Sequence, residues 1–229
     1  MESHLHCLPS PASPCEAVIV LNGTPPPTAL VRQLITPSSI LIAADGGAAA
    51  CLEAGVLPHH VVGDLDSLSA AHLKLLAAPP VTFHRHPREK DATDGELALL
   101  LAARLGATRL CLTGTRGGRT SQFLGNLGLL HLAHQMGIPA TLREVGEETQ
   151  LVVGPGSLDI TGRPGNLLSL VPLCDCRGVS LAGVRWPLED ATLPAGTSLG
   201  ISNELVAARV HLELTAGILV VVREWQEEF

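Results

Sequence analysis

The sequence is poor in lysine, carries a net negative charge and has no long apolar run. Lysine occurs only at Lys74 and Lys90, so arginine supplies nearly all of the positive charge. The formal net charge of −7 offers no electrostatic footprint for nucleic acid. No apolar run is long enough for a transmembrane helix, and residues 1–15 contain no Lys or Arg and lack the form of a secretory signal. We therefore expect no nucleic-acid partner and no membrane partner, and we expect residues 1–15 to form a flexible tail.

The six cysteines show neither a Cys-x-x-Cys pair nor a regular spacing. Cys51 and Cys111 lie in apolar surroundings, and Cys174 and Cys176 have no second pair with which to complete a zinc site. Because disulfides are rare in reducing compartments, this pattern is typical of free thiols in such a compartment. We therefore expect a cytoplasmic protein.

Strand-like and helix-like segments alternate from Glu16 to about residue 145. This alternation predicts an α/β domain over residues 16–145, with a mainly parallel sheet flanked by helices. From residue 146 onwards, Gly and Pro separate short strand-like segments, including one at residues 197–201. This second pattern predicts a small all-β sandwich domain over residues 146–229. The 229 residues, of which 46% are hydrophobic, are sufficient to bury a core.

Acidic residues follow two of the predicted strands at the point where each strand ends. Asp45, with Gly46 and Gly47 beside it, comes directly after an apolar run, and Asp64 and Asp66 follow Val61-Val62-Gly63. Open α/β sheets bind their ligands outside the carboxyl ends of the strands. Carboxylates gathered there suit Mg²⁺, which takes oxygen ligands and often shares them with substrate phosphates.

A third acidic site precedes a predicted helix. In Lys90-Asp91-Ala92-Thr93-Asp94, Thr93 and the Glu96 that follows have the capping-box pattern of a helix start. Asp94 is therefore expected at the N-terminus of that helix. Asp94 is then either a functional carboxylate or a residue that only complements the helix dipole. Lys90 is either a phosphate contact or a member of a surface ion pair.

Residues 114–119 form a Gly-rich turn that contains Arg116 and Arg119. The turn is neither a Walker A loop nor a Gly-x-Gly-x-x-Gly fingerprint. Backbone N–H groups at a helix start, together with two guanidinium groups, could cradle a phosphate, although a structural turn with solvated arginines would look the same. Acidic loops facing such an anion site suggest metal-assisted phosphoryl transfer.

Motifs spread through most of the chain resemble those of the thiamine pyrophosphokinase family. They are Leu21-Asn22-Gly23, Ala44-Asp45-Gly46-Gly47, Gly63-Asp64-Leu65-Asp66-Ser67, Lys90-Asp91-Ala92-Thr93-Asp94, Gly117-Gly118-Arg119 with Asn126 beyond, and Gly200-Ile201-Ser202-Asn203-Glu204. The resemblance implies an N-terminal α/β catalytic domain, a C-terminal β-sandwich and a homodimer that holds thiamine between its subunits. The implied reaction is Mg²⁺-dependent transfer of diphosphate from ATP to the hydroxyl of thiamine, giving thiamine diphosphate and AMP.

The resemblance also implies roles for individual residues. Asp64, Asp66 and Asp94 are expected to be the catalytic carboxylates and the Mg²⁺ ligands, one of them taking the hydroxyl proton. The nucleotide and its metal site are expected to involve Asp45, Gly46, Gly47, Lys90, Thr93, Arg119 and Gln122, with the two glycines allowing close backbone approach. Ser202 and Asn203 are expected to contact thiamine from the partner subunit. Trp186 is expected either to stack on a thiamine ring or to lie buried in the sandwich.

The sequence departs from the family pattern at Ser121, where the family usually has Asp. This departure keeps open a catalytically silent protein that binds thiamine diphosphate or a nucleotide. Another open alternative is a diphosphokinase acting on a different alcohol, such as a hydroxymethylpterin. A Mg²⁺-dependent phosphohydrolase is a third.

Overall fold

The computed structural model describes residues 15–77 and 80–226, so the predicted tail lies almost entirely outside the described residues. The helices in the described part are α1 (Thr28–Leu34), α2 (Gly47–Glu53), α3 (Ala70–Leu76), α4 (Asp94–Arg104) and α5 (Thr120–Gln135). The strands of the first half are β1 (Glu16–Val20), β2 (Ile40–Ala44), β3 (His60–Gly63), β4 (Thr82–Arg85), β5 (Arg109–Thr113) and β6 (Ala140–Glu144). Those of the second half are β7 (Glu147–Val153), β8 (Gly156–Thr161), β9 (Leu167–Pro172), β10 (Cys176–Ala182), β11 (Leu188–Leu193), β12 (Asn203–Glu204), β13 (Arg209–Leu214) and β14 (Ile218–Glu224).

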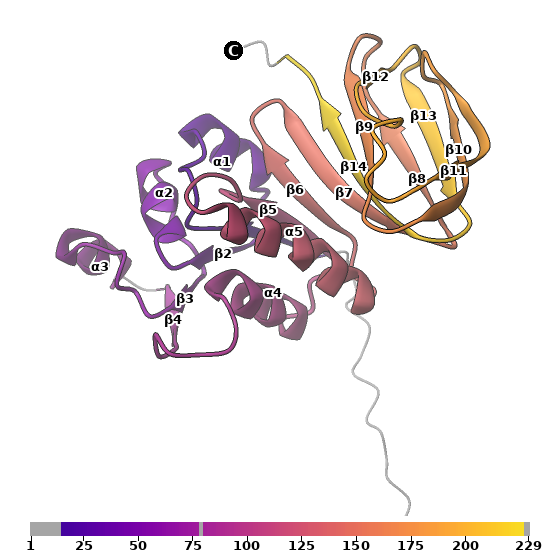
Figure 1. Cartoon of the computed structure of the whole chain (residues 1–229). Helices are drawn as coiled ribbons and strands as arrows, with labels where there is room; N and C mark the ends of the chain where they lie inside the picture. Colours follow the sequence, from indigo (N-terminus) through magenta and orange to yellow (C-terminus); the bar gives the residue numbers. More distant parts are fainter. Residues whose placement is uncertain (1–14, 78–79, 227–229) are drawn as a thin grey trace, which may run out of the picture.

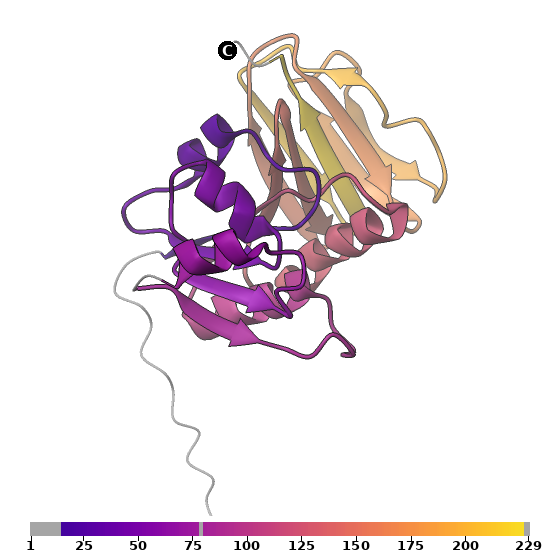
Figure 2. The ribbon, with the colours of Figure 1, turned by 90° about the vertical axis from the view of Figure 1, so that its left-hand side faces the viewer.

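The first half is the predicted parallel sheet with helices on both faces (Figures 1 and 2). Its strands lie in the order β4-β3-β2-β1-β5-β6, and every neighbouring pair is parallel. Successive side chains of a strand point to opposite faces, so Ala17 and Ile19 of β1 pack with α4 and α5, whereas Val18 and Val20 pack with α2 and α3. Because both faces are covered, β1 and β2 read as continuous apolar runs.

The second half is a sandwich of two sheets, but one of them continues the sheet of the first half. A hairpin between β6 and β7 turns the parallel sheet into an antiparallel one, which goes on through β14, β9 and β12 to make ten strands. A separate antiparallel sheet in the order β11-β10-β13-β8 packs against it around an apolar core that includes Leu168, Leu181 and Leu212 (Figure 1). The fold class is thus the predicted one. The domain boundary that we propose at residue 145 falls in the turn of the β6–β7 hairpin.

Two details of the second half differ from the sequence prediction. Residues 197–201 were expected to form a strand, but they form turns, with N–H groups of Thr197 and Ile201 donating to nearby carbonyls. The strand β11 was not predicted, because its acidic residues break the apolar alternation. It pairs with β10 through register shifts, and its Asp190 has a left-handed φ of 45°.

The described cysteines, which exclude Cys7, are all free. Burial raises the pKa of both Cys51 and Cys111 to about 12, so these thiols stay protonated at neutral pH. Among the described residues, no helix combines the length and the apolar character needed to cross a membrane.

Candidate active site

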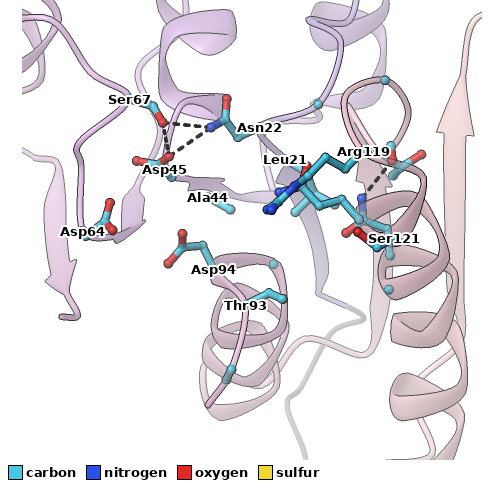
Figure 3. Close-up of a pocket in the computed structure, with 18 of the residues that line it drawn as sticks. Leu21, Asn22, Ala44, Asp45, Asp64, Ser67, Thr93, Asp94, Arg119 and Ser121 are labelled. Carbon is cyan, nitrogen blue, oxygen red and sulfur yellow. Dashed lines mark hydrogen bonds between the residues drawn. The ribbon is translucent and has the colours of Figure 1, made fainter. Parts of the chain in front are cut away.

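A cavity of ≈ 570 Å³ opens at the carboxyl ends of the parallel strands. Its walls come from the ends of β1, β2 and β3, from the start of α4, and from the loop between β5 and α5. Figure 3 shows its acidic side chains, among them Asp45, Asp64 and Asp94, on one side and Arg119 on the other. The predicted meeting of strand-end carboxylates at one edge of the sheet is therefore observed.

Three carboxylates form the acidic side of the cavity. Asp45, Asp64 and Asp66 each offer an oxygen within 4.8 Å of the oxygens of the other two. The second oxygen of Asp45, Oδ2, accepts hydrogen bonds from Asn22 Nδ2 at 3.0 Å and from Ser67 Oγ at 2.5 Å. Asn22 Nδ2 also donates to Ser67 Oγ at 3.0 Å, so the two residues brace Asp45 and each other.

Unusual backbone conformations bring these carboxylates together. Asp45 and Leu65 have left-handed φ angles of 47° and 67°. The Asp45 N–H donates to Val62 O at 2.8 Å, which ties the end of β2 to β3. The left-handed turn at Leu65 buries that side chain, and the Asp66 N–H donates to Asp64 Oδ1 at 3.1 Å. Such conformations carry a free-energy cost, and they cluster at functional sites.

The acidic group has the properties of a divalent-cation site. Carboxylate oxygens are the ligands that Mg²⁺ prefers. Asp45 Oδ1 is buried and has no hydrogen-bond donor among the described residues. Leaving such an oxygen unsatisfied is costly, and a cation would satisfy it. The residues present therefore fit Mg²⁺.

Asp94 lies beside this group but is not one of the three. It is the first residue of α4, whose N-cap is Thr93, and the Thr93 hydroxyl accepts from the Glu96 N–H at 3.1 Å as the capping pattern predicted. The Asp94 carboxylate forms an ion pair with Lys90, Nζ to Oδ1 3.1 Å. A side chain on Gly63 would meet it, since a Cβ there would lie 3.1 Å from Asp94 Oδ1 and 3.2 Å from Asp45 Cβ.

Burial raises the pKa of Asp94, and the nearby charges of Asp45 and Asp64 raise it further, while Lys90 opposes the shift. The sequence prediction grouped Asp94 with Asp64 and Asp66. In the structure the three carboxylates with oxygens within 4.8 Å of one another are Asp45, Asp64 and Asp66, and Asp94 lies beside them, paired with Lys90. The role of Asp94 as a Mg²⁺ ligand stays a prediction.

The loop between β5 and α5 forms the basic side of the cavity. The N–H and hydroxyl of Thr115 both donate to Glu144 Oε1 at 2.7 Å, and Asn126 Nδ2 donates to Thr115 O at 2.8 Å. Burial raises the pKa of Glu144, and the two bonds from Thr115 oppose this shift. Arg116 is ion-paired with Glu147 and turned away from the cavity wall.

Arg119 is the arginine of this loop that remains for a ligand. It lines the cavity, is exposed, and has no acidic partner among the described residues. It is also the N-cap residue of α5, whose first turn contains no acidic side chain. Ser121 and Gln122 in that turn line the cavity as well. The start of this helix therefore lies at the cavity with no side-chain cap and no acidic side chain in its first turn, which favours an anion there.

Gly46 and Gly47 pack against the end of β1 and the residues that follow it. Neither lines the cavity. A Cβ on Gly46 would lie 2.1 Å from Asn22 Oδ1, and one on Gly47 would lie 2.1 Å from Val20 O. The close approach that these glycines allow is thus between α2 and β1.

The predicted thiamine contacts lie in the sandwich and do not line the cavity. The Trp186 side chain is 56% exposed, so the alternative of a buried sandwich tryptophan is wrong. Asn203 is buried and holds the Trp186 backbone, accepting from its N–H at 3.1 Å and donating to its carbonyl at 2.7 Å. Ser202 has a φ of 57°, and its N–H donates to Ser169 Oγ at 3.0 Å.

Several residues of the cavity had no role assigned from the sequence. Asn22, Ser67 and Asn126 stood within or beside the quoted motifs, which was the signal that could have found them. The contact between Thr115 and Glu144 spans 29 residues of sequence and left no local pattern. Arg88 also lines the cavity, with Nε 3.9 Å from Asp66 Oδ2.

Known proteins share both the sequence and the fold of this chain. Residues 31–142 match the family model of the thiamin pyrophosphokinase catalytic domain, and residues 157–219 match that of the thiamin pyrophosphokinase vitamin B1 binding domain. The thiamine pyrophosphokinase of Bacillus subtilis (strain 168) is 30% identical over 187 residues, which cover 81% of this chain and 87% of the relative.

Solved structures give the same result. A crystal structure of thiamine pyrophosphokinase from Bacillus subtilis aligns with a TM-score of 0.83 at 27% identity, covering 93% of this chain and 100% of the other. That of thiamin pyrophosphokinase from Geobacillus thermodenitrificans aligns with a TM-score of 0.80 at 26% identity, covering 93% and 99%. The cavity, the two matched regions and these relatives agree, and the chain belongs to the thiamine pyrophosphokinase family.

Proposed function

We propose that this chain transfers the diphosphate of ATP to the hydroxyl of thiamine, which gives thiamine diphosphate and AMP. The observation that carries the proposal is the cavity itself. Carboxylates from two strand ends and one helix start face an open helix N-terminus and Arg119 across a space of ≈ 570 Å³. Such a pairing of acidic and basic walls suits a triphosphate that arrives with a divalent cation.

The acidic wall is the proposed Mg²⁺ site. Asp64 and Asp66, joined by Asp45, would hold the ion, and Asp94 would complete the acidic rim around it. Bound there, Mg²⁺ would neutralise phosphate oxygens and orient them for in-line attack. The brace of Asn22 and Ser67 keeps Asp45 in place, so Asp45 would need little rearrangement on binding.

The basic wall is the proposed phosphate site. Arg119 would pair with phosphate oxygens through its guanidinium group, and the N–H groups at the start of α5 would add hydrogen bonds. Lys90 would stay beside Asp94 and contact the same phosphates, because it lines the cavity next to that carboxylate. The N-terminal turn of α4, fixed by the Thr93 cap, would orient Asp94 toward the reacting groups.

The binding site for thiamine would be completed by a second copy of the chain. Ser202, Asn203 and Trp186 lie outside the cavity of their own subunit, so they would serve the cavity of a partner in a homodimer. Exposed apolar side chains surround this region, including Leu199 at 65% and Val206 at 55% exposure. A homodimer that covers them would remove this apolar area from water. The ring of Trp186 would stack on thiamine, and Asn203 would act by holding the Trp186 segment.

We propose a cytoplasmic location, which the free cysteines of the described residues support. A net charge of −7 is compatible with small-molecule substrates. The cation and Arg119 would offset the negative charge of the carboxylates only within the cavity.

The alternative of a silent binding protein depended on Ser121. An uncharged residue in the first turn of α5 leaves the helix start positive, and a phosphate group is favoured there. Ser121 is therefore compatible with nucleotide binding and turnover.

The test is AMP release from ATP and Mg²⁺ with thiamine, with a hydroxymethylpterin, or with no acceptor. We expect AMP and thiamine diphosphate in equal amounts, and neither product when thiamine is omitted. Faster turnover with the pterin would reassign the acceptor. Phosphate release without any acceptor would instead indicate a hydrolase, and tight ligand binding without AMP would indicate a silent binder.

A further inference from the structure

A second cavity, of ≈ 600 Å³, lies where α1 meets the β-sandwich. Its walls come from α1, from the end of β6, from the turn between β8 and β9, and from the segment that follows β14. It shares no lining residue with the catalytic cavity. We call it the arginine cavity, after Arg143, Arg163 and Arg223 in its walls.

The arginine cavity concentrates positive charge in a chain that is negative overall. Three of the 15 Lys and Arg residues of the sequence line it, and none of its described lining residues is Asp or Glu. Part of this charge is compensated from outside the wall, since Glu148 Oε2 lies 3.1 Å from Arg223 Nη2. The described walls therefore offer guanidinium groups with no carboxylate among them.

Two of the three arginines are fixed in place by their surroundings. Arg143 donates to the carbonyls of Glu144 and Glu147 at 2.8 and 3.1 Å. The guanidinium groups of Arg143 and Arg223 lie 4.2 and 4.3 Å from the ring centroid of Trp225. These cation–π contacts orient both groups.

Unsatisfied donors remain in this wall. Arg223 Nε is buried and has no hydrogen-bond acceptor among the described residues. Arg163 is exposed and has no acidic partner in the part of the chain that the structure describes. The Arg163 N–H donates to Asn166 Oδ1 at 2.9 Å, and this bond fixes the turn that presents the arginine. A buried donor without an acceptor is costly, so an anion that supplies acceptor oxygens would be stabilised.

We propose that the arginine cavity binds a small molecule through a diphosphate or triphosphate group. Guanidinium groups pair with phosphate oxygens in a bidentate manner, and several of them suit more than one phosphate. Because no carboxylate occurs among its described lining residues, we expect this binding to need no divalent cation. The proposal does not depend on the transfer reaction.

The fluorescence of Trp225 provides a local readout. The chain has two tryptophans, so the Trp186→Phe variant leaves Trp225 as the single emitter. In this background we would titrate inorganic diphosphate in EDTA, which removes cation-assisted binding at the catalytic cavity. We expect a saturable change in Trp225 emission. Adding Arg163→Ala is expected to weaken the apparent affinity about tenfold or more, because one charge-assisted pair is lost. Arg177→Ala, a change of an exposed arginine outside the cavity, is the matched control and should leave the affinity unchanged.

Four results would overturn the proposal. One is the absence of a saturable change, and another is an equal affinity in the Arg163→Ala variant, whose fold circular dichroism would verify. A further one is the same emission change in sodium chloride at matched ionic strength, because the signal would then report charge screening and not diphosphate binding. Glu227 and Glu228 follow this cavity in the sequence. Binding that appeared only when both are changed to Gln would show that the chain's own carboxylates exclude the ligand, which also contradicts the proposal.

Discussion

The catalytic cavity and the arginine cavity differ in the charges that line them. The first has an acidic side, where Asp45, Asp64 and Asp66 lie close together and Asp45 Oδ1 is buried with no hydrogen-bond donor among the described residues. The second has arginines and no carboxylate among its described lining residues, and Arg223 Nε is buried with no acceptor in the described part of the chain. The acidic cavity can accept a polyphosphate only together with a cation, whereas the basic one can accept it directly. A single chain would thus have two sites for a polyphosphate group, one that needs a cation and one that does not. Each site can be tested without the other.

The largest expected effect is on the acidic side. We expect Asp94→Asn to lower AMP formation by about 10²–10³-fold, because a charge that faces the reacting groups is lost. Steady-state assays with ATP, Mg²⁺ and thiamine would measure it. Asp159→Asn, which changes an exposed carboxylate of the sandwich, is the control and should keep full activity. Turnover near that of the unchanged protein in Asp94→Asn would remove Asp94 from the site.

The basic side of the catalytic cavity should respond more weakly. We expect Arg119→Ala to raise the KM for ATP by about 10–100-fold, since one charge-assisted hydrogen-bonding group is lost. The KM for thiamine should change much less. Arg177→Ala again serves as the control. Equal rises in both KM values would mean that Arg119 supports the whole cavity and does not bind phosphate itself.

The packing beneath the acidic side predicts an effect on stability. Gly47→Ala places a Cβ against Val20 O, so we expect a loss of about 1–3 kcal/mol in the free energy of unfolding. Gly128→Ala, inside α5 with nothing within 4 Å of the added Cβ, should instead gain about 0.5–1 kcal/mol. Urea unfolding would compare the two. If Gly47→Ala were neutral, the close approach of α2 to β1 would be wrong.

The smallest expected effect concerns pH. The folded pKa of Asp94 is raised above 3.8, so ionisation of this group costs stability as pH rises from 3.8 through its folded pKa. In the metal-free protein, Asp94→Asn removes that cost. The variant should therefore gain in free energy of unfolding relative to the unchanged chain at neutral pH, and the gain should vanish below 3.8. A difference that did not change with pH would contradict the raised pKa.

The sequence was sufficient for the parts of the site that follow from topology. Asp45 and Asp64 were predicted to meet because parallel strands end at one edge of a sheet, and Thr93 was predicted to cap α4 from local spacing. The mainly parallel sheet and the sandwich followed in the same way from the change in hydrophobic pattern.

Contacts between distant residues could not be predicted in this way. Nothing local in the sequence indicates that Gly46 packs on Asn22 or that Glu144 holds Thr115. The sequence alone also could not show how Asp94 lies relative to Asp64, because that depends on how α4 docks at the strand ends. The arginine cavity could not be predicted for the same reason. Its walls come from four separate segments of the chain, and no local motif marks it.

We propose that the carboxylates at the sheet edge share one divalent cation. Electron paramagnetic resonance of Mn²⁺, titrated into the protein in place of Mg²⁺, measures this binding. We expect saturable binding to the unchanged chain, weakened about 10–100-fold in Asp64→Asn and unchanged in Asp159→Asn. Equal Mn²⁺ affinity in the unchanged chain and in Asp64→Asn would contradict it.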